Sequence, residues 1–151
     1  DCLPVLIAAP SGAVAAAHAG WRGLAAGVLA ATVAALREIA PDVDRAIAVI
    51  GPHVDASCYE VDEPVVRALA ARFGDAANAA LRETRAGHGE IDLARLARLD
   101  LEAAGLSSDR IAAIPDACTA CDPERFYSFR RDGPRAGRLF HFVTASASGA
   151  A

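Results

Sequence analysis

Hydrophobic and polar residues follow two different spacings in the first third of the chain. Two apolar runs, 3–9 and 13–18, are separated by Pro-Ser-Gly, which predicts a hairpin of two buried strands. Apolar residues then recur at helical spacing over 24–40, and the Pro-Asp pair that follows predicts the end of that helix. A third apolar run over 45–50, closed by Gly-Pro, predicts another strand.

The rest of the chain continues to mix the two kinds of element. The pattern predicts helices over 62–73, 76–84 and 92–104, short strands over 58–61, 110–114 and 139–144, and a flexible tail over 146–151. Because the order is not a regular βαβ alternation, we expect an α+β fold, a single mixed α/β domain. The 151 residues match the size of one domain, and no repeat or linker divides them.

Composition excludes several classes of protein. The formal net charge of −4 argues against general affinity for nucleic acids or anionic membranes. The longest uncharged apolar stretch, 24–36, is shorter than the ~20 residues that a membrane span needs. Four cysteines in a chain of this size do not form a disulfide framework, so we expect a reduced, cytoplasmic setting. Because the chain lacks methionine and starts with Asp-Cys, we also expect its natural front to be missing.

Cys2 and His18 each lie at the edge of a predicted strand of the hairpin, where they could face each other across a pocket. A thiolate and an imidazole are good zinc ligands. They are equally a nucleophile and its general base. A buried cysteine and a locally hydrogen-bonded histidine would give the same pattern, so all three interpretations stay open.

The Gly20-Trp21-Arg22-Gly23 turn leads from a predicted strand into a helix. Backbone N–H groups at a helix start favour an anion, and the Arg22 guanidinium adds a charged fork, so the turn could hold phosphate. It is neither a P-loop nor a dinucleotide fingerprint, because neither spacing matches. The alternative is an ordinary turn covered by Trp21.

Further candidate ligands lie later in the chain. Cys118 and Cys121 have the C-x-x-C spacing of a zinc knuckle or a redox pair, but a zinc ribbon needs a second pair and the sequence has none. Cys58 and His53 could supply further metal ligands, or could belong to a loop that packs into the core. His88, between two glycines, is predicted to lie exposed in a break.

A basic and aromatic segment follows the C-x-x-C pair. Rings for stacking and guanidinium groups for phosphate suit a nucleoside ligand or single-stranded nucleic acid, and a solvated loop is the alternative. Nearby acidic residues dilute the charge, so we favour a small ligand or the solvated loop over nucleic acid. The segment contains Arg125, Phe126, Tyr127, Phe129, Arg130, Arg131, Arg135 and Arg138.

Several of these segments, taken in order, resemble the motifs of one family. They are Asp1–Val5, His18–Gly23, Gly51-Pro52 with Cys58–Val61, and Cys118-Thr119 with Phe126–Gly133. The chain resembles the laccase-domain family, also called multicopper polyphenol oxidoreductase or peptidoglycan editing factor. The resemblance implies a zinc-dependent purine nucleoside phosphorylase, acting on adenosine, inosine or methylthioadenosine with phosphate, that also deaminates adenosine.

The resemblance also implies a fold and a ligand set. The fold is shared with bacterial toxin deamidases that use a Cys-His pair, and residues 1–145 would form this domain without its N-terminal segment. One zinc is held by two histidines and one cysteine in the family. Cys2 and His18 match two of these ligands, which makes them the implied catalytic residues, and the other histidine lies upstream in the family. Copper is disfavoured, because a multicopper oxidase needs many histidines and this chain has 4.

Other functions remain as alternatives. A metal-free cysteine hydrolase or amidase could use Cys2 as nucleophile and His18 as base on cell-wall precursors, in peptidoglycan editing. A copper polyphenol oxidase would fit the older family name. A non-enzymatic domain that senses nucleotides or binds a partner, without turnover, is a third alternative. The sequence leaves the oligomeric state undefined.

Overall fold

A computed structural model of the chain describes residues 1–145, so the tail predicted over 146–151 lies outside the described residues. The described part contains a four-stranded sheet of order β2-β1-β3-β7. Strand β1 is antiparallel to both of its neighbours, whereas β3 and β7 are parallel. The strands are β1 (Leu3–Ala8), β2 (Val14–Ala19), β3 (Ile47–Ile50) and β7 (Ile111–Ala113). The predicted hairpin and the two later strands are confirmed.

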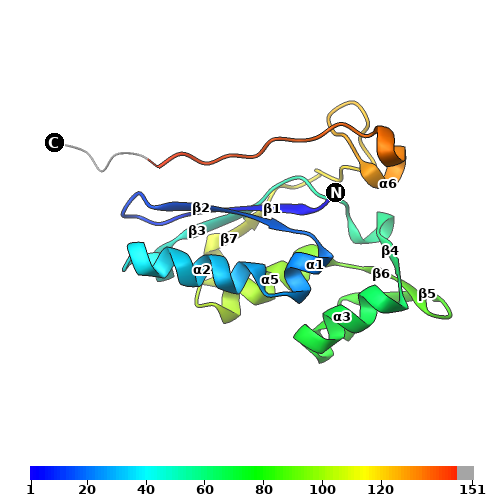
Figure 1. Ribbon diagram of the computed structural model, residues 1–151, viewed down its shortest axis with the longest axis horizontal. Coiled ribbons are helices and arrows are strands. Elements are labelled where there is room, and N and C mark those ends of the chain that lie inside the picture. The colour runs from blue at the N-terminus through cyan, green and yellow to red at the C-terminus, as the bar shows by residue number, and fades with distance from the viewer. Residues whose placement is uncertain (146–151) are drawn as a thin grey trace.

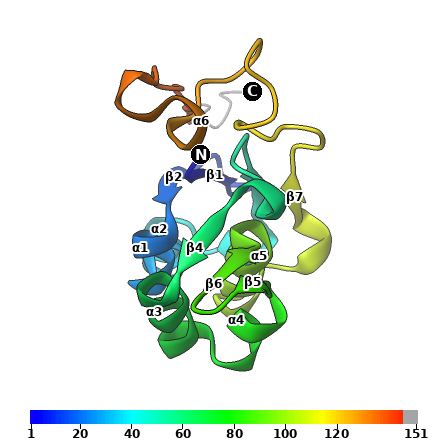
Figure 2. The same ribbon diagram turned by 90° about the vertical axis from the view of Figure 1, so that its right-hand side faces the viewer.

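A second, smaller sheet lies beyond one end of the first (Figures 1 and 2). It has three antiparallel strands in the order β4-β6-β5. These are β4 (Glu60–Asp62), β5 (Leu81–Arg85) and β6 (His88–Ile91). Helix α3 (Glu63–Phe73) follows β4 directly and ends at Gly74. The two sheets and the interspersed helices confirm the mixed α/β class.

Helices cover one face of the four-stranded sheet, and an extended C-terminal segment crosses its other face (Figure 1). The helices are α1 (Trp21–Ala25), α2 (Val28–Ile39) and α5 (Leu93–Ala103). The side chains of Leu3, Val5 and Ile7 alternate along β1 and are fully buried in the core beneath these helices. Within residues 1–145, no helix has the length and apolar character that crossing a bilayer requires.

The helix predicted over 24–40 is interrupted. It forms α1 and α2, which are separated at Gly27. Gly27 has a φ of 78°, in the left-handed region that favours glycine, and a Cβ there would lie 3.1 Å from the Arg72 guanidinium. Apolar spacing alone did not reveal the break, because the apolar positions continue on both sides of it.

The helix predicted over 76–84 was also wrong in its second half. Helix α4 (Asp75–Ala79) is one short turn, and the chain then forms β5. The polar residues of β5 suit an exposed edge strand, where Arg82 pairs with Glu90 of the neighbouring strand. His88 is half-buried in β6 instead of lying exposed in a break.

The strand predicted over 139–144 does not form among the described residues. The segment is extended but joins no ladder there, and the residues Phe140 and Phe142 are 92% and 80% exposed. A strand needs a partner for its backbone groups, which an alternating sequence does not supply. Before this segment come the short helix α6 (Phe129–Asp132) and a single turn over Gly133–Arg135.

Candidate functional site

The hairpin brings Cys2 and His18 to one end of the sheet. Leu3 pairs with Ala19 and Pro4 with His18, so Cys2 falls opposite the buried Gly20. A Cβ on Gly20 would lie 2.7 Å from the Cys2 Sγ and 3.8 Å from the His18 Nε2. The thiol and the imidazole therefore approach the same point, and the absence of a side chain on Gly20 leaves room for both.

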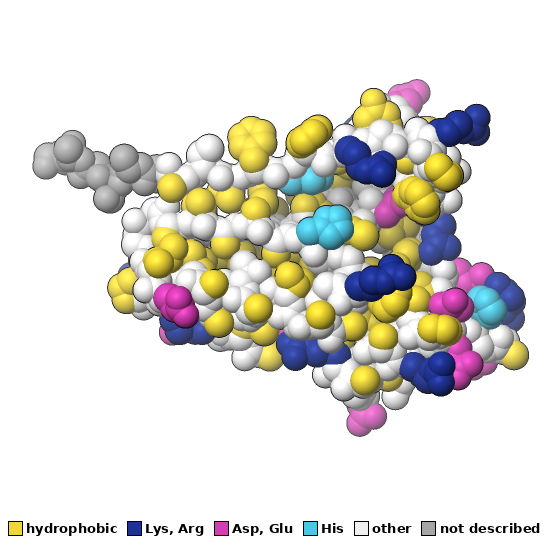
Figure 3. All heavy atoms as spheres, viewed as in Figure 1, with side chains coloured by type: hydrophobic (Ala, Val, Ile, Leu, Met, Phe, Trp, Pro, Cys, Tyr) yellow, Lys and Arg dark blue, Asp and Glu magenta, His cyan; other side chains and the backbone are white. Residues whose placement is uncertain are grey.

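Cys2 and His18 line one pocket of about 260 Å³ with residues from the C-terminal part of the chain. The space-filling view shows histidine side chains where the extended segment passes over the sheet (Figure 3). Tyr127 and Phe129 also line the pocket, and these residues are 56% and 60% exposed. The pocket thus combines two possible ligands with flat apolar surfaces, beside Arg138, Leu139 and His141.

Asp1 fixes the start of β1 against the C-terminal loops. Its Oδ1 accepts hydrogen bonds of 2.7 Å from the hydroxyls of Thr119 and Ser128, both almost fully buried. Its Oδ2 accepts the backbone N–H of Arg130 at 2.7 Å. These bonds hold Cys2 beside the aromatic residues, although more than a hundred positions separate Asp1 from its partners.

Sequence reasoning missed His141. It lines the pocket with Cys2 and His18, and its Nδ1 lies 3.6 Å from where a Cβ on Gly51 would be. Partial burial lowers the pKa of His141 below 6.5, which favours the neutral imidazole at pH 7. The Phe-His-Phe alternation could have drawn attention to it, because it puts the histidine on the opposite face of an extended segment from its neighbours.

The structure places Arg22 outside the lining of this pocket, in a helix of only five residues. Its guanidinium lies 4.2 Å from the centre of the Trp21 ring, and Trp21 packs against the core. Nearby, the guanidinium of Arg130 lies 4.9 Å from the centre of the Tyr59 ring. Burial raises the pKa of Tyr59, and so does the negative charge of Cys2, while Arg130 and Arg22 act to lower it. Arg22 and Arg130 therefore both favour the ionised form of the Tyr59 phenol, which also responds to Cys2.

Other arginines of the basic and aromatic segment hold its loop together. Arg131 donates to the backbone carbonyls of Thr119 and Phe126 at 2.9 Å and pairs with Asp132. Arg125 pairs with Asp122. These two arginines are thus structural in this loop, and the side chains that face the pocket are those of Tyr127, Phe129 and Arg138.

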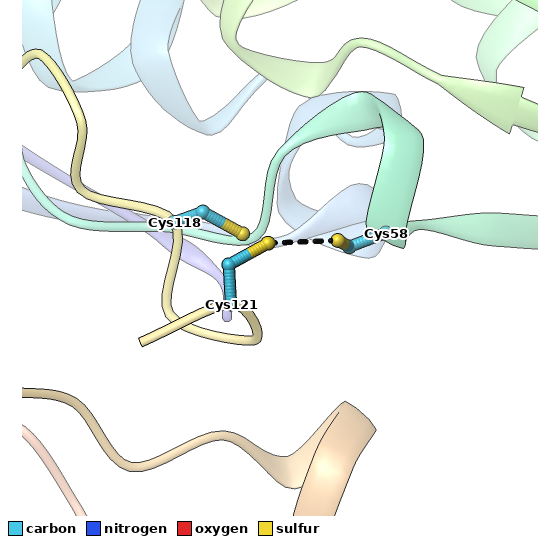
Figure 4. Close-up of side chains that lie close together, drawn as sticks. All are labelled: Cys58, Cys118 and Cys121. Atoms are coloured by element: carbon cyan, nitrogen blue, oxygen red, sulfur yellow. Dashed lines mark hydrogen bonds between the residues drawn. The ribbon is translucent and has the colours of Figure 1, made fainter. Parts of the chain in front are cut away.

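A separate group of three thiols forms where two loops meet (Figure 4). The Sγ atoms of Cys58, Cys118 and Cys121 all lie within 4.8 Å of one another, and those of Cys58 and Cys121 are 3.1 Å apart. Cys58 ends the 3-10 helix η2 (Ala56–Cys58), and the other two lie in the loop after β7. All three cysteines are free.

His53 does not join this group. It is buried, and its Nδ1 lies 2.8 Å from the carbonyl oxygen of Gly51. Its backbone pairs with the loop at Cys118, which brings that loop beside the segment that leads to Cys58. Cys58 therefore lies beside the two cysteines of the C-x-x-C pair and not beside the imidazole of His53. The sequence suggested Cys58 and the C-x-x-C pair only as separate possible metal ligands.

The three thiols differ in their proton affinity. Burial acts to raise the pKa of the Cys118 thiol. Hydrogen bonds outweigh this effect and lower the pKa; they come from the thiol of Cys121 and from the backbone N–H groups of Asp55, Cys121 and Ala120. The Asp55 N–H lies 3.4 Å from the Cys118 Sγ. Hydrogen bonds with Cys58 and then with Cys118 raise the pKa of Cys121 to about 12. Within residues 1–145, these three thiols are the one group of three potential ligand atoms that could hold a metal ion.

Known proteins share this sequence and fold. Residues 1–146 match the family described as multi-copper polyphenol oxidoreductase laccase. A purine nucleoside phosphorylase of Xylella fastidiosa (strain 9a5c) is 47% identical over 140 residues, which are 92% of this chain and 52% of the relative. Adenosine deaminase RL5, from an unknown prokaryotic organism, is 35% identical over 141 residues, which are 93% of this chain and 53% of the relative.

The comparison with solved structures agrees with the sequence comparison. The crystal structure of the Bacillus licheniformis hypothetical protein YfiH matches with a TM-score of 0.80 and 33% identity, covering 88% of this chain and 51% of that one. The chain thus spans about half the length of the relatives it matches. Both the motifs and the fold confirm the resemblance, and the chain belongs to the multi-copper polyphenol oxidoreductase laccase family.

Proposed function

We propose that this chain carries part of the active site of a zinc-dependent purine nucleoside phosphorylase that also deaminates adenosine. The observation that carries the proposal is the pocket in which Cys2 and His18 lie with Tyr127 and Phe129. The names of the Xylella fastidiosa and RL5 relatives support the two activities. The substrates would be a purine nucleoside with phosphate or with water.

The donor atoms fit part of a zinc site. Cys2 and His18 offer the thiolate and imidazole that zinc prefers, and Gly20 leaves space between them. The resemblance implies a histidine outside residues 1–151 as the third protein ligand. Zinc rather than copper suits both activities, because neither reaction changes an oxidation state and zinc has no redox chemistry. When bound, zinc supplies Lewis-acid chemistry that activates water or polarises an oxygen of the substrate.

The side chains of the chain suggest how a nucleoside would bind. The purine ring would stack on the rings of Tyr127 and Phe129, which line the pocket. A neutral His141 would accept or donate a hydrogen bond inside the pocket. Arg22 and Arg130 do not line the pocket, but both act electrostatically on Tyr59, as Cys2 does. From that position they would bind phosphate beside the pocket and lower the repulsion between it and the thiolate.

The two reactions use the same bound nucleoside. In phosphorolysis, a phosphate oxygen forms a bond to C1′ of the ribose while the bond from C1′ to the base breaks. In deamination, water adds at C6 of adenosine and ammonia leaves. The pocket would orient the nucleoside in both cases, so the nucleophile decides which bond breaks.

Metal analysis and product analysis test this proposal. The protein, with any sequence that naturally flanks residues 1–151, would be incubated with adenosine in the presence and absence of phosphate. We expect adenine and ribose 1-phosphate with phosphate, and inosine from deamination. Cys2→Ala and His18→Ala should each reduce both activities by about 100-fold or more, because a missing ligand weakens the metal site. Zinc-supplied, folded protein that forms neither product would contradict the proposal.

The second candidate is a metal-free cysteine hydrolase acting on amide bonds of cell-wall precursors. The same closeness of Cys2 and His18 favours it, because a thiol beside an imidazole is also a nucleophile with its base. Thiol alkylation would abolish such an activity, and removal of zinc would not change it. The phosphorylase proposal predicts loss of activity in both treatments.

A further inference from the structure

The three thiols of Cys58, Cys118 and Cys121 have a spacing that suits one metal ion. A zinc–sulfur bond is about 2.3 Å long, so two thiolates of a tetrahedral site lie roughly 3.8 Å apart. The Sγ atoms here lie within 4.8 Å of one another, and the Cys58–Cys121 pair is 3.1 Å apart. Small side-chain rotations would therefore bring all three into bonding distance of one ion.

The loop that carries two of the thiols is held in place by other contacts. Arg131 donates to the carbonyl oxygens of Thr119 and Ala120 at 2.9 and 3.2 Å, between the two cysteines. The hydroxyl of Thr119 donates to Asp1 at 2.7 Å. The ligands are thus positioned before any metal binds, which reduces the ordering cost of binding.

Backbone N–H groups also point at the sulfur of Cys118. The Asp55 N–H donates to its Sγ at 3.4 Å, and Asp55 is in turn linked to Cys58, whose N–H donates to the Asp55 carbonyl oxygen at 3.0 Å. Such donors stabilise the negative charge of a thiolate. In metal sites, hydrogen bonds to a ligating side chain also fix its orientation, and the Asp55 N–H would do the same for the Cys118 Sγ. This observation is independent of the sulfur spacing.

We propose that Cys58, Cys118 and Cys121 form a second metal site, separate from the Cys2–His18 pocket, that binds one Zn²⁺ through three thiolates. Sulfur ligands select zinc over magnesium or calcium, which prefer oxygen. Binding transfers the remaining thiol protons to solvent. A tetrahedral site needs a fourth ligand, and because Cys121 is exposed, a water molecule would supply it.

The site would join two distant segments of the chain. Cys58 and Cys121 are 63 residues apart, and a shared ion would fasten η2 to the loop after β7. That loop contacts Asp1 through Thr119, so the ion would steady the residue that precedes Cys2. We therefore expect a structural role that supports the pocket from outside.

Metal content in a background without the pocket ligands tests the proposal. The protein with its natural flanking sequence would carry Cys2→Ser and His18→Ala, be purified with reductant, and be supplied with zinc. We expect about one zinc per chain to remain, as the three-ligand geometry requires. Adding Cys58→Ser or Cys121→Ser should weaken zinc binding more than about 100-fold, because even the loss of an outer partner costs 10–100-fold. The Cys2→Ser/His18→Ala protein with Cys58, Cys118 and Cys121 intact is the matched control.

Cobalt gives a readout that does not depend on activity or on the amount of metal bound by other sites. In the Cys2→Ser/His18→Ala background, Co²⁺ should give a sulfur-to-cobalt charge-transfer band, and the band should disappear in Cys58→Ser/Cys121→Ser. Absence of both zinc and the band in the folded background protein would overturn the proposal. A Cys58–Cys121 disulfide formed in the presence of reductant and zinc would also overturn it. Neither result bears on the phosphorylase proposal, which depends on the other two ligands.

Discussion

Gly20 has no side chain, and the pocket depends on that absence. Its φ of −69° and ψ of 171° are accessible to any residue, so the backbone does not require glycine there. The requirement comes from the Cys2 Sγ, which would lie 2.7 Å from an added Cβ. The Cys2 thiol therefore occupies the space that a side chain at position 20 would need.

We expect Gly20→Ala to damage the pocket without unfolding the protein. The added methyl must displace the Cys2 side chain, and a displacement of about 1 Å can reduce catalysis by about 100-fold. Activity and zinc content of the pocket measure the effect, and thermal unfolding checks the fold. Gly87→Ala is the control, because its φ of 72° makes alanine costly while, among the described residues, no atom beyond its chain neighbours lies within 4 Å of the added Cβ. It should reduce stability and leave the pocket intact. Wild-type zinc content and activity in Gly20→Ala would contradict the expectation.

The thiol of Cys121 is exposed but should react slowly in the metal-free protein. Its pKa is raised to about 12 by hydrogen bonds with Cys58 and Cys118, above the ~8.5 of a free cysteine, so at pH 8 it holds less of the reactive thiolate. Cys58→Ala removes the largest cause, lowers the pKa of Cys121 and should speed its alkylation.

Iodoacetamide labelling at several pH values, followed by peptide mass spectrometry, measures this rate. The rate for Cys121 should rise with pH well above 8.5 in the wild type and at lower pH in Cys58→Ala. Alkylation of wild-type Cys121 at the rate of an ordinary free cysteine at pH 8 would refute the expectation.

At the scale of elements, a buried ion pair joins α3 to α5. Arg72 donates to the Oδ1 of Asp100 at 2.7 Å, and the carboxylate is 5% exposed. Its Oδ2 has no hydrogen-bond partner among residues 1–145. The same guanidinium lies against Gly27, where the predicted long helix divides. One side chain thus connects two helices and the junction between α1 and α2.

Arg72→Ala should lower the free energy of unfolding by about 3 kcal/mol, because it leaves the Asp100 carboxylate buried without its partner. Arg67→Ala, on the same helix, is the control. Its pair with Glu63 is exposed at 3.7 Å, and its loss should cost less than about 0.5 kcal/mol. Urea unfolding monitors both variants. Equal effects of the two substitutions would show that the buried pair contributes nothing beyond a surface pair.

Across the whole molecule, Asp1 connects the first strand to loops near the other end of the chain. Its carboxylate accepts hydrogen bonds from the hydroxyls of Thr119 and Ser128 and from the backbone N–H of Arg130. Because both hydroxyls are buried, they depend on this acceptor.

Asp1→Ala should cost about 1–3 kcal/mol for each buried hydroxyl that loses its acceptor, and should loosen the loop over 118–132. Asp1→Asn should be milder, because the amide oxygen still accepts from the two hydroxyls. Chemical unfolding gives the stability, and hydrogen exchange locates the loosening. Unchanged exchange over 118–132 in Asp1→Ala would mean that the network does not hold the loop.

Much of the fold could be predicted from the sequence, because periodicity is a property of neighbouring residues. The hairpin, the helix over 62–73 and the helix after Asp92 followed from apolar spacing and from residues that begin or end helices. The two wrongly predicted helices had causes that apolar spacing does not contain, namely a backbone conformation and a strand partner. Gly27 divides a continuous apolar pattern, and residues 81–85 became a strand because β6 offers them a partner.

For the candidate site, too, some features follow from local sequence and others from tertiary packing. The sequence by itself determined the hairpin that places Cys2 opposite Gly20, since a short turn fixes which residues face each other. Only the tertiary structure decided that His141 enters the same pocket and that Cys58 meets Cys121. Those contacts join residues far apart in the chain. They depend on how β3, β7 and the C-terminal loops pack, which no local spacing records.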